Sequence, residues 1–102
     1  MFTDGILFKN NENLFTGVVR NLKGNKEAKI ICKKYKDNRY NVFIDCDGKI
    51  SRVGTLILIN PIQVRGDKLY KQIGIIKLFN DDYEYNVLED KTKNGKVYYK
   101  IL

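Results

Sequence analysis

The stretch Glu27–Ile59, EAKIICKKYKDNRYNVFIDCDGKISRVGTLILI, decides the fold of this chain. Its short runs of β-branched and aromatic residues are separated by turn residues, and helical spacing is nearly absent, which is typical of antiparallel strands. Asp37-Asn38 fits a two-residue hairpin turn, and Asp47-Gly48 fits a type I′ turn, in which both central residues are left-handed. The stretch therefore predicts consecutive strands near residues 27–36, 39–46 and 49–59.

The same pattern continues on both sides of this stretch. Lys23-Gly24-Asn25 is a polar loop, and Asn94-Gly95 fits a second type I′ turn. Asn60-Pro61 should end a strand, because proline cannot donate to the ladder. Gly74 interrupts a strong strand and predicts a bulge or sharp bend that lets the sheet curl. The further strands are predicted near residues 4–9, 14–20, 69–79, 83–89 and 96–101.

A chain of 102 residues with this many strands predicts one all-β domain covering residues 1–102. Strands this long and numerous must protect their edges from other chains, and a small closed or layered structure does so. We therefore expect a compact antiparallel barrel or sandwich of about seven to eight strands.

Cysteine usage and the absence of targeting signals predict a cytoplasmic protein. On the two-residue turn at Asp37-Asn38, Cys32 faces Phe43 and Cys46 lies on the other face of the hairpin, so a disulfide is excluded. Two buried thiols in a reducing compartment are expected instead. The N-terminus has no basic stretch followed by an apolar run, and the longest apolar run, Leu56–Ile59, is too short to span a membrane.

The residues that most enzymes need are missing. There is no histidine, which excludes Ser-His and Cys-His nucleophile pairs and removes the commonest metal ligand. Ser51 is the only serine, and the two cysteines are fourteen residues apart with no C-x-x-C motif. The sequence therefore predicts a protein that is not an enzyme and that needs no cofactor and no metal.

Positive charge is concentrated in one window of the chain. Eight of the nineteen Lys and Arg residues lie in Arg20–Arg39, where only Glu27 and Asp37 oppose them, so the window carries +6 of the total +7. Such a surface suits a polyanion, most often nucleic acid. Lysine outnumbers arginine, which favours contacts to backbone phosphates over base reading. The alternative is a solvated basic surface, since AT-rich coding DNA also favours lysine.

Tyrosines are interleaved with these lysines. On the expected register Tyr35 faces Tyr40, beside Lys33. Exposed tyrosines can stack on unpaired bases while lysines neutralise phosphates. Alternatively the two tyrosines form a cross-strand pair that only stabilises the hairpin. The predicted nucleic-acid-binding residues are Arg20, Lys29, Lys33, Lys34, Tyr35, Lys36, Arg39 and Tyr40.

A series of short motifs extends over most of the chain. They are Gly5–Lys9, Phe15-Thr16-Gly17, Tyr40–Phe43, Val53-Gly54, the Tyr-led strand Tyr70–Leu78, Tyr85–Asp90 and Val97–Ile101. In this order they resemble a small uncharacterised bacterial family found on plasmids, conjugative elements and phages, domain of unknown function seven-three-six. The resemblance implies a mobile-element setting and no established activity, so no catalytic residue follows from it.

Two functions are consistent with these observations. The first is a non-enzymatic mobile-element protein that binds nucleic acid through a basic, tyrosine-containing β-hairpin. The alternative is a phage or mobile-element anti-defence protein, for example an anti-CRISPR inhibitor, that binds a host nucleoprotein defence complex directly. The basic charge argues against mimicry of DNA in that second case. No membrane partner is expected, and the oligomeric state is left open.

Overall fold

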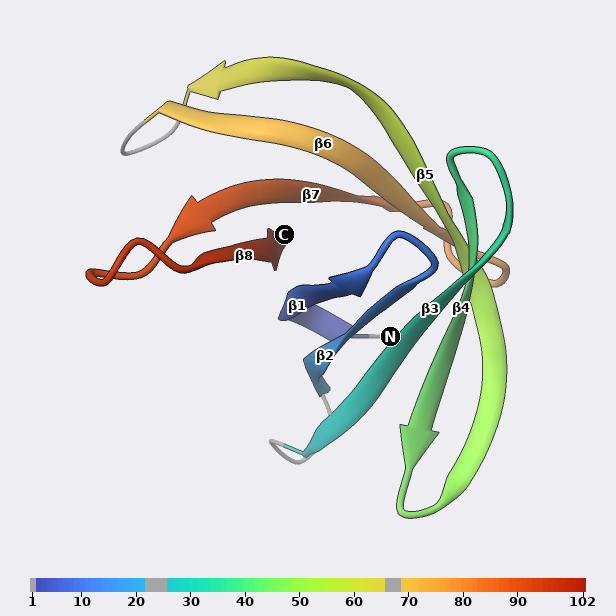
Figure 1. The fold of residues 1–102 in the computed structure, drawn as a ribbon. Coiled ribbons are helices and arrows are strands. Elements are labelled where there is room, and N and C mark those ends of the chain that lie inside the picture. The colour runs from blue at the N-terminus through green and yellow to red at the C-terminus, as the bar shows by residue number, and fades with distance from the viewer. Residues whose placement is uncertain (1, 22–25, 66–68) are drawn as a thin grey trace.

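Antiparallel strands close into a barrel in which every strand pairs with the next one along the chain and β8 pairs with β1 (Figure 1). The computed structural model describes residues 2–21, 26–65 and 69–102, so the predicted loop at Lys23-Gly24-Asn25 lies outside the described residues. The strands are β1 (Phe2–Asn11), β2 (Leu14–Asn21), β3 (Glu27–Lys36), β4 (Arg39–Cys46), β5 (Lys49–Arg65), β6 (Leu69–Leu78), β7 (Glu84–Lys91) and β8 (Val97–Ile101). The predicted all-β fold is confirmed, and the architecture is the barrel rather than the sandwich. The described part of the chain contains no helix that is long and apolar enough to cross a membrane.

The longest strand, β5, connects two parts of the barrel. It pairs with β4 as far as Ile57 and with β6 as far as Arg65. Figure 1 shows it running from the turn after β4 at the bottom of the view to the start of β6 at the top. The prediction that Asn60-Pro61 ends a strand is therefore wrong. Pro61 lies in a register shift between Leu58 and Ile62, where the ladder is irregular and proline's missing N–H is tolerated.

Irregularities elsewhere in the ladder let the sheet bend. The pairing of β6 with β7 shifts between Gln72 and Gly74, which confirms the bulge predicted at Gly74. Two further glycines, Gly17 and Gly54, occupy inward-facing positions where a β-carbon would overlap a carbonyl oxygen of the neighbouring strand. Such glycines allow two strands to approach closely where a barrel curves.

The hairpin turns are only partly those predicted. Asp47 and Gly48 have φ of 54° and 85°, so the type I′ turn between β4 and β5 is confirmed. At the β7–β8 turn only Gly95 is left-handed, with φ of 80°, and its N–H donates to the Thr92 carbonyl at 2.9 Å. The type I′ turn predicted at Asn94-Gly95 is therefore wrong, and a longer loop with one left-handed residue joins these strands.

The two-residue turn predicted at Asp37-Asn38 is confirmed, since Lys36 pairs with Arg39, but a bulge beside it changes the register of the hairpin. Only Asn38 is left-handed there, with φ of 61°, and the ladder shifts between Lys34 and Lys36. Tyr35 is thus an extra residue on β3 with no partner on β4, which is a β-bulge. Beyond it Cys32 pairs with Val42, not with Phe43 as predicted. A shift of one residue exchanges the inner and outer faces of β4 relative to β3.

Apolar side chains from all eight strands fill the interior, as expected for a barrel of this strand number. The Phe15 ring lies edge-on to Tyr40, 5.2 Å away between centroids, and to Tyr99, 5.7 Å away. Two tyrosine hydroxyls join segments that are distant in the sequence: Tyr40 donates to the Glu12 carbonyl in the β1–β2 turn and Tyr85 to the Phe2 carbonyl on β1, both at 2.8 Å. Tyr40 therefore belongs to the core.

The two cysteines differ in exposure, and both are free thiols. Burial raises the pKa of the Cys32 thiol to about 12. Cys46 is exposed at the end of β4, where it pairs with Lys49 beside the turn, so the expectation of two buried thiols is wrong for Cys46. The structure predicts that a thiol reagent at pH 8 modifies Cys46 rapidly in the folded protein and Cys32 only after unfolding. A Cys46→Ser variant should be unreactive until it is unfolded, and rapid reaction of that variant would contradict the burial of Cys32.

Candidate nucleic-acid interface

The outer surface of the β3–β4 hairpin brings lysines and an aromatic ring together. Ile31 pairs with Phe43, and on β3 Lys29 and Lys33 lie one position to either side on the same face. The Lys33 ammonium nitrogen is 5.7 Å from the centroid of the half-buried Phe43 ring. The aromatic residue on the lysine face is therefore Phe43, because the bulge at Tyr35 turns Phe43 outward.

Strand β5 extends this surface with an arginine. Arg52 is the ladder partner of Phe43, and its guanidinium carbon is 5.0 Å from the centroid of the exposed Phe79 ring. We call this surface the Phe43 face; its members are Lys29, Ile31, Lys33, Phe43, Arg52 and Phe79.

The cations of the Phe43 face have no carboxylate partner among the described residues. In the described part of the chain Lys29, Lys33 and Arg52 form no ion pair. Asp45, the ladder partner of Lys29, is the acid closest to them along the ladder. Exposed cations without a fixed partner can take up phosphate oxygens without first breaking a salt bridge.

At the tip of the hairpin, only two of the three predicted binding residues are accessible. Tyr35 is 48% exposed, and the Lys36 ammonium nitrogen is 5.8 Å from its ring centroid, so both are accessible to a ligand. Arg39 is half-buried beside its ladder partner Ile57, and its Nη1 is buried with no hydrogen-bond partner among the described residues. That nitrogen reaches a ligand only if the side chain rotates.

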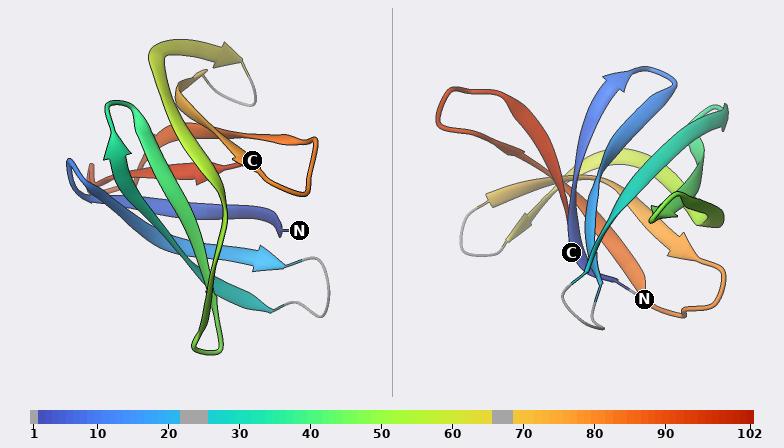
Figure 2. Two further views of the ribbon diagram at one scale, coloured as in Figure 1. Left: turned by 90° about the vertical axis from the view of Figure 1, so that its right-hand side faces the viewer. Right: turned by 90° about the horizontal axis from the view of Figure 1, so that it is seen from below.

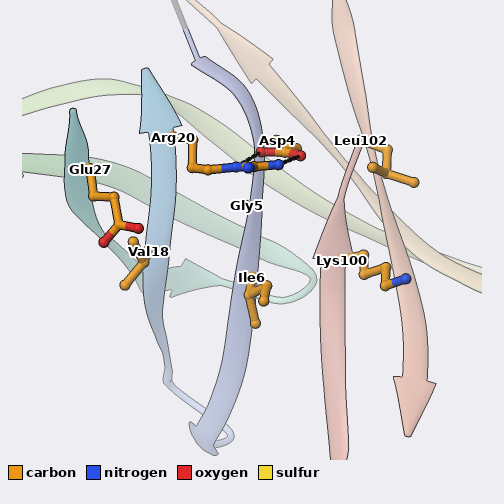
Figure 3. Close-up of a pocket in the computed structure, with 8 residues that line it drawn as sticks. All are labelled: Asp4, Gly5, Ile6, Val18, Arg20, Glu27, Lys100 and Leu102. Atoms are coloured by element: carbon orange, nitrogen blue, oxygen red, sulfur yellow. Dashed lines mark hydrogen bonds and ion pairs between the residues drawn. The ribbon is translucent and has the colours of Figure 1, made fainter. Parts of the chain in front are cut away.

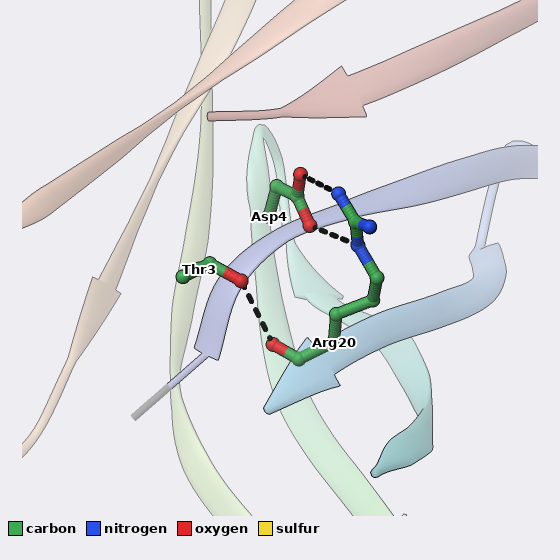
Figure 4. Close-up of polar contacts among 3 residues, drawn as sticks. All are labelled: Thr3, Asp4 and Arg20. Atoms are coloured by element: carbon green, nitrogen blue, oxygen red, sulfur yellow. Dashed lines mark hydrogen bonds and ion pairs between the residues drawn. The ribbon is translucent and has the colours of Figure 1, made fainter. Parts of the chain in front are cut away.

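Arg20 is held by an acid on the neighbouring strand. Its Nε donates to Asp4 Oδ1 at 2.8 Å, and a second guanidinium nitrogen donates to Asp4 Oδ2 (Figure 4). The Thr3 hydroxyl also donates to the Arg20 carbonyl at 3.4 Å. The Arg20 guanidinium keeps the pKa of the Asp4 carboxyl below its usual value. The assignment of Arg20 as a free phosphate contact is therefore not supported.

Lys34 and Tyr40 are also separated from the Phe43 face. They are ladder partners on the inward-facing side of the hairpin, and the Lys34 ammonium nitrogen lies 3.7 Å from an Asp37 carboxylate oxygen. Tyr40 is only 2% exposed, so its ring cannot stack on a base. The alternative of a Tyr35–Tyr40 cross-strand pair is wrong as well, because Tyr35 has no ladder partner on β4.

A groove of about 410 Å³ lies on the outer side of β1 and β2 (Figure 3). Ile6 and Val18 form an apolar floor, and they are 43% and 41% exposed. The cations at its rim are engaged: Arg20 binds Asp4, and the Lys100 ammonium nitrogen is 3.3 Å from an Asp90 carboxylate oxygen. This groove is a poorer site for a polyanion than the Phe43 face.

Within the described ranges, no group of three or more Cys, Asp or Glu side chains is arranged to hold a metal ion. Comparison with models of known protein families, with curated proteins and with solved structures found no match to this chain. The resemblance to domain of unknown function seven-three-six therefore stays a prediction. The structure itself defines a closed antiparallel barrel with a basic and aromatic outer face.

Proposed function

We propose that this protein binds nucleic acid, without catalysing a reaction on it, through the Phe43 face. The observation that supports this most directly is the placement of Lys33 beside the Phe43 ring and of Arg52 beside the Phe79 ring, with neither cation in an ion pair with a described residue. The cations suit phosphates and the rings suit bases. The mobile-element setting is part of the proposal and rests on the family resemblance alone.

The number of available cations sets the expected strength and salt dependence of binding. Lys29, Lys33, Arg52 and, at the hairpin tip, Lys36 are exposed. For single strands, each neutralised phosphate contributes about −0.7 to the slope of log affinity against log salt, which gives roughly −2 to −3 for three or four contacts. Stacking of one base on an aromatic ring adds roughly 1–3 kcal/mol, which depends little on salt.

The test is binding of labelled single-stranded DNA, RNA and duplex DNA, measured by fluorescence anisotropy over a salt series. We expect the triple variant Lys29→Ala/Lys33→Ala/Arg52→Ala to bind roughly 10- to 100-fold more weakly at low salt, with a slope shallower by about 2 to 3. The matched control, Lys71→Ala/Lys91→Ala/Lys93→Ala, removes the same charge from another part of the surface.

Two outcomes would contradict the proposal. One is no binding of any nucleic acid by the wild-type protein at low salt. The other is an equal loss of affinity in the triple variant and its control, which would mean that only total charge matters. Thermal unfolding of both variants checks that they are folded.

A further inference from the structure

The Phe43 face continues around the barrel as a row of outward-facing side chains. The ladder pairs Phe43 with Ile31, Ile31 with Thr16, and Thr16 with Phe8, so the row crosses β4, β3, β2 and β1. Successive strands lie about 4.8 Å apart, which separates the ends of the row by roughly 14 Å along the sheet. Phe8 is 40% exposed and lies 6.5 Å from the Tyr98 ring between centroids.

A second cation lies over the ring at the far end of this row. The Lys96 ammonium nitrogen is 5.3 Å from the Phe8 ring centroid, much as Lys33 lies 5.7 Å from the Phe43 ring. Lys96 forms no ion pair with any residue that the structure describes. We call Phe8, Tyr98 and Lys96 the Phe8 unit. The barrel thus presents twice an outward-facing ring with a lysine over it, and neither lysine is in an ion pair with a described residue.

None of the residues in the row between Phe8 and Phe43 is an acid. Thr16 and Ile31 are half-buried, and Lys29 lies on the neighbouring row next to Val18. Figure 2 (right) shows the β1–β2 hairpin between the β7–β8 and β3–β4 hairpins, so a ligand crossing it would reach both units. A chain with negative charge along its length and flat groups at intervals matches this surface.

We propose that the ligand is a single strand of DNA or RNA that crosses β1 to β4 on the outer side and stacks unpaired bases on Phe8 and Phe43. This inference rests on the proposed function and specifies its ligand. Bases in a duplex are already stacked on each other and cannot lie on either ring. The distance between the rings requires a strand of about four nucleotides or more, which is the lower end of the range for small β-barrel modules.

The test compares oligothymidine and oligouridine of about 2 nucleotides, which are too short to reach both rings, with the same oligomers of about 12 nucleotides. We expect the variant Phe8→Ala/Lys96→Ala to lose roughly 10- to 100-fold in affinity for the longer strand and little for the shorter one, which the Phe43 face alone can hold. The matched control is Ile62→Ala/Arg65→Ala, which removes an exposed apolar side chain and an exposed cation from the end of β5 that pairs with β6. Phe8→Leu, which keeps an apolar contact but removes the ring, covers the case in which Phe8→Ala unfolds. An equal loss of affinity for the longer oligothymidine and the longer oligouridine supports a site that accepts DNA and RNA alike.

The outcomes separate this inference from the proposed function. If the Phe8 variants bind the longer strand like the wild type while Lys29→Ala/Lys33→Ala/Arg52→Ala does not, the path over Phe8 is overturned and the proposed function stands. Tighter binding of duplex DNA than of either single strand also overturns the path. If the wild type binds no nucleic acid at all, the proposed function itself is wrong.

Discussion

Replacing Gly17 by alanine is expected to lower the free energy of unfolding by roughly 3 kcal/mol or more, a large effect for the addition of one methyl group. The new β-carbon would overlap the Ile6 carbonyl oxygen and crowd the Leu7 backbone. Because the obstructing atoms belong to the main chain of β1, the side chain cannot avoid them by changing rotamer. Urea denaturation followed by fluorescence or circular dichroism measures the loss.

Substitutions at two other glycines show whether the loss of stability comes from lack of space or from backbone conformation. Gly54→Ala should cost about as much as Gly17→Ala, since its β-carbon would overlap the Lys77 carbonyl oxygen. Gly95 has φ of 80° and open space around it, so Gly95→Ala should cost only about 1–2 kcal/mol. If Gly17→Ala were no more harmful than Gly95→Ala, the close approach of β1 and β2 would be wrong.

Truncation of the Tyr40 side chain is also expected to cause a large loss of stability. Tyr40→Ala should destabilise the barrel by roughly 3–5 kcal/mol, because it removes a core ring packed on Phe15 and leaves a cavity. Tyr40→Phe keeps the ring but removes the hydroxyl that donates to the Glu12 carbonyl, and should cost about 1–2 kcal/mol. Both values are measurable by urea denaturation.

The Tyr40→Phe variant also tests whether Tyr40 belongs to the core or to a binding surface. Tyr40→Phe should leave nucleic-acid affinity unchanged while it lowers stability. Tyr35→Phe is the matched control, because Tyr35 is exposed and no hydrogen bond of its hydroxyl is part of the described structure. Loss of affinity in Tyr40→Phe without loss of stability would contradict the core assignment.

The positions of the strands could be predicted because the pattern is local. β3 and β4 begin and end at the predicted residues, Glu27–Lys36 and Arg39–Cys46. Pro61 misled the prediction for β5, since whether a proline ends a strand depends on the regularity of the ladder around it. That regularity is a property of how β5 meets β6, and composition alone does not reveal it.

The candidate site was only partly predictable, because it depends on register. Lys29 and Lys33 lie on an outer face as predicted, but the register predicted without the bulge at Tyr35 placed Tyr40 beside them in place of Phe43. The alternation in β4 indicated the other register: Tyr40, Val42 and Ile44 are apolar, whereas the alternate positions include polar Asn41 and Asp45. Matching that apolar set to the apolar set of β3 would have indicated the bulge.

The remaining differences depend on pairings between residues distant in the sequence. Arg20 is neutralised by Asp4, which becomes its ladder partner only when β1 and β2 pair. Arg52 reaches Phe43 because the pairing of β4 with β5 shifts between Val42 and Phe43. The window of high charge ends before Arg52, so a local count of charges could not include it.

The extra residue at Tyr35 is the one position of this hairpin where the chain could be shortened without disturbing the barrel. If Tyr35 were deleted, Lys34 would still pair with Tyr40 and Lys36 with Arg39, around a regular two-residue turn, so Phe43 would stay on the outer surface. A one-codon deletion inside β4 would instead exchange the two sides of the strand beyond it. For protein engineering, a shortened version of this turn should therefore remove Tyr35 and leave the length of β4 unchanged.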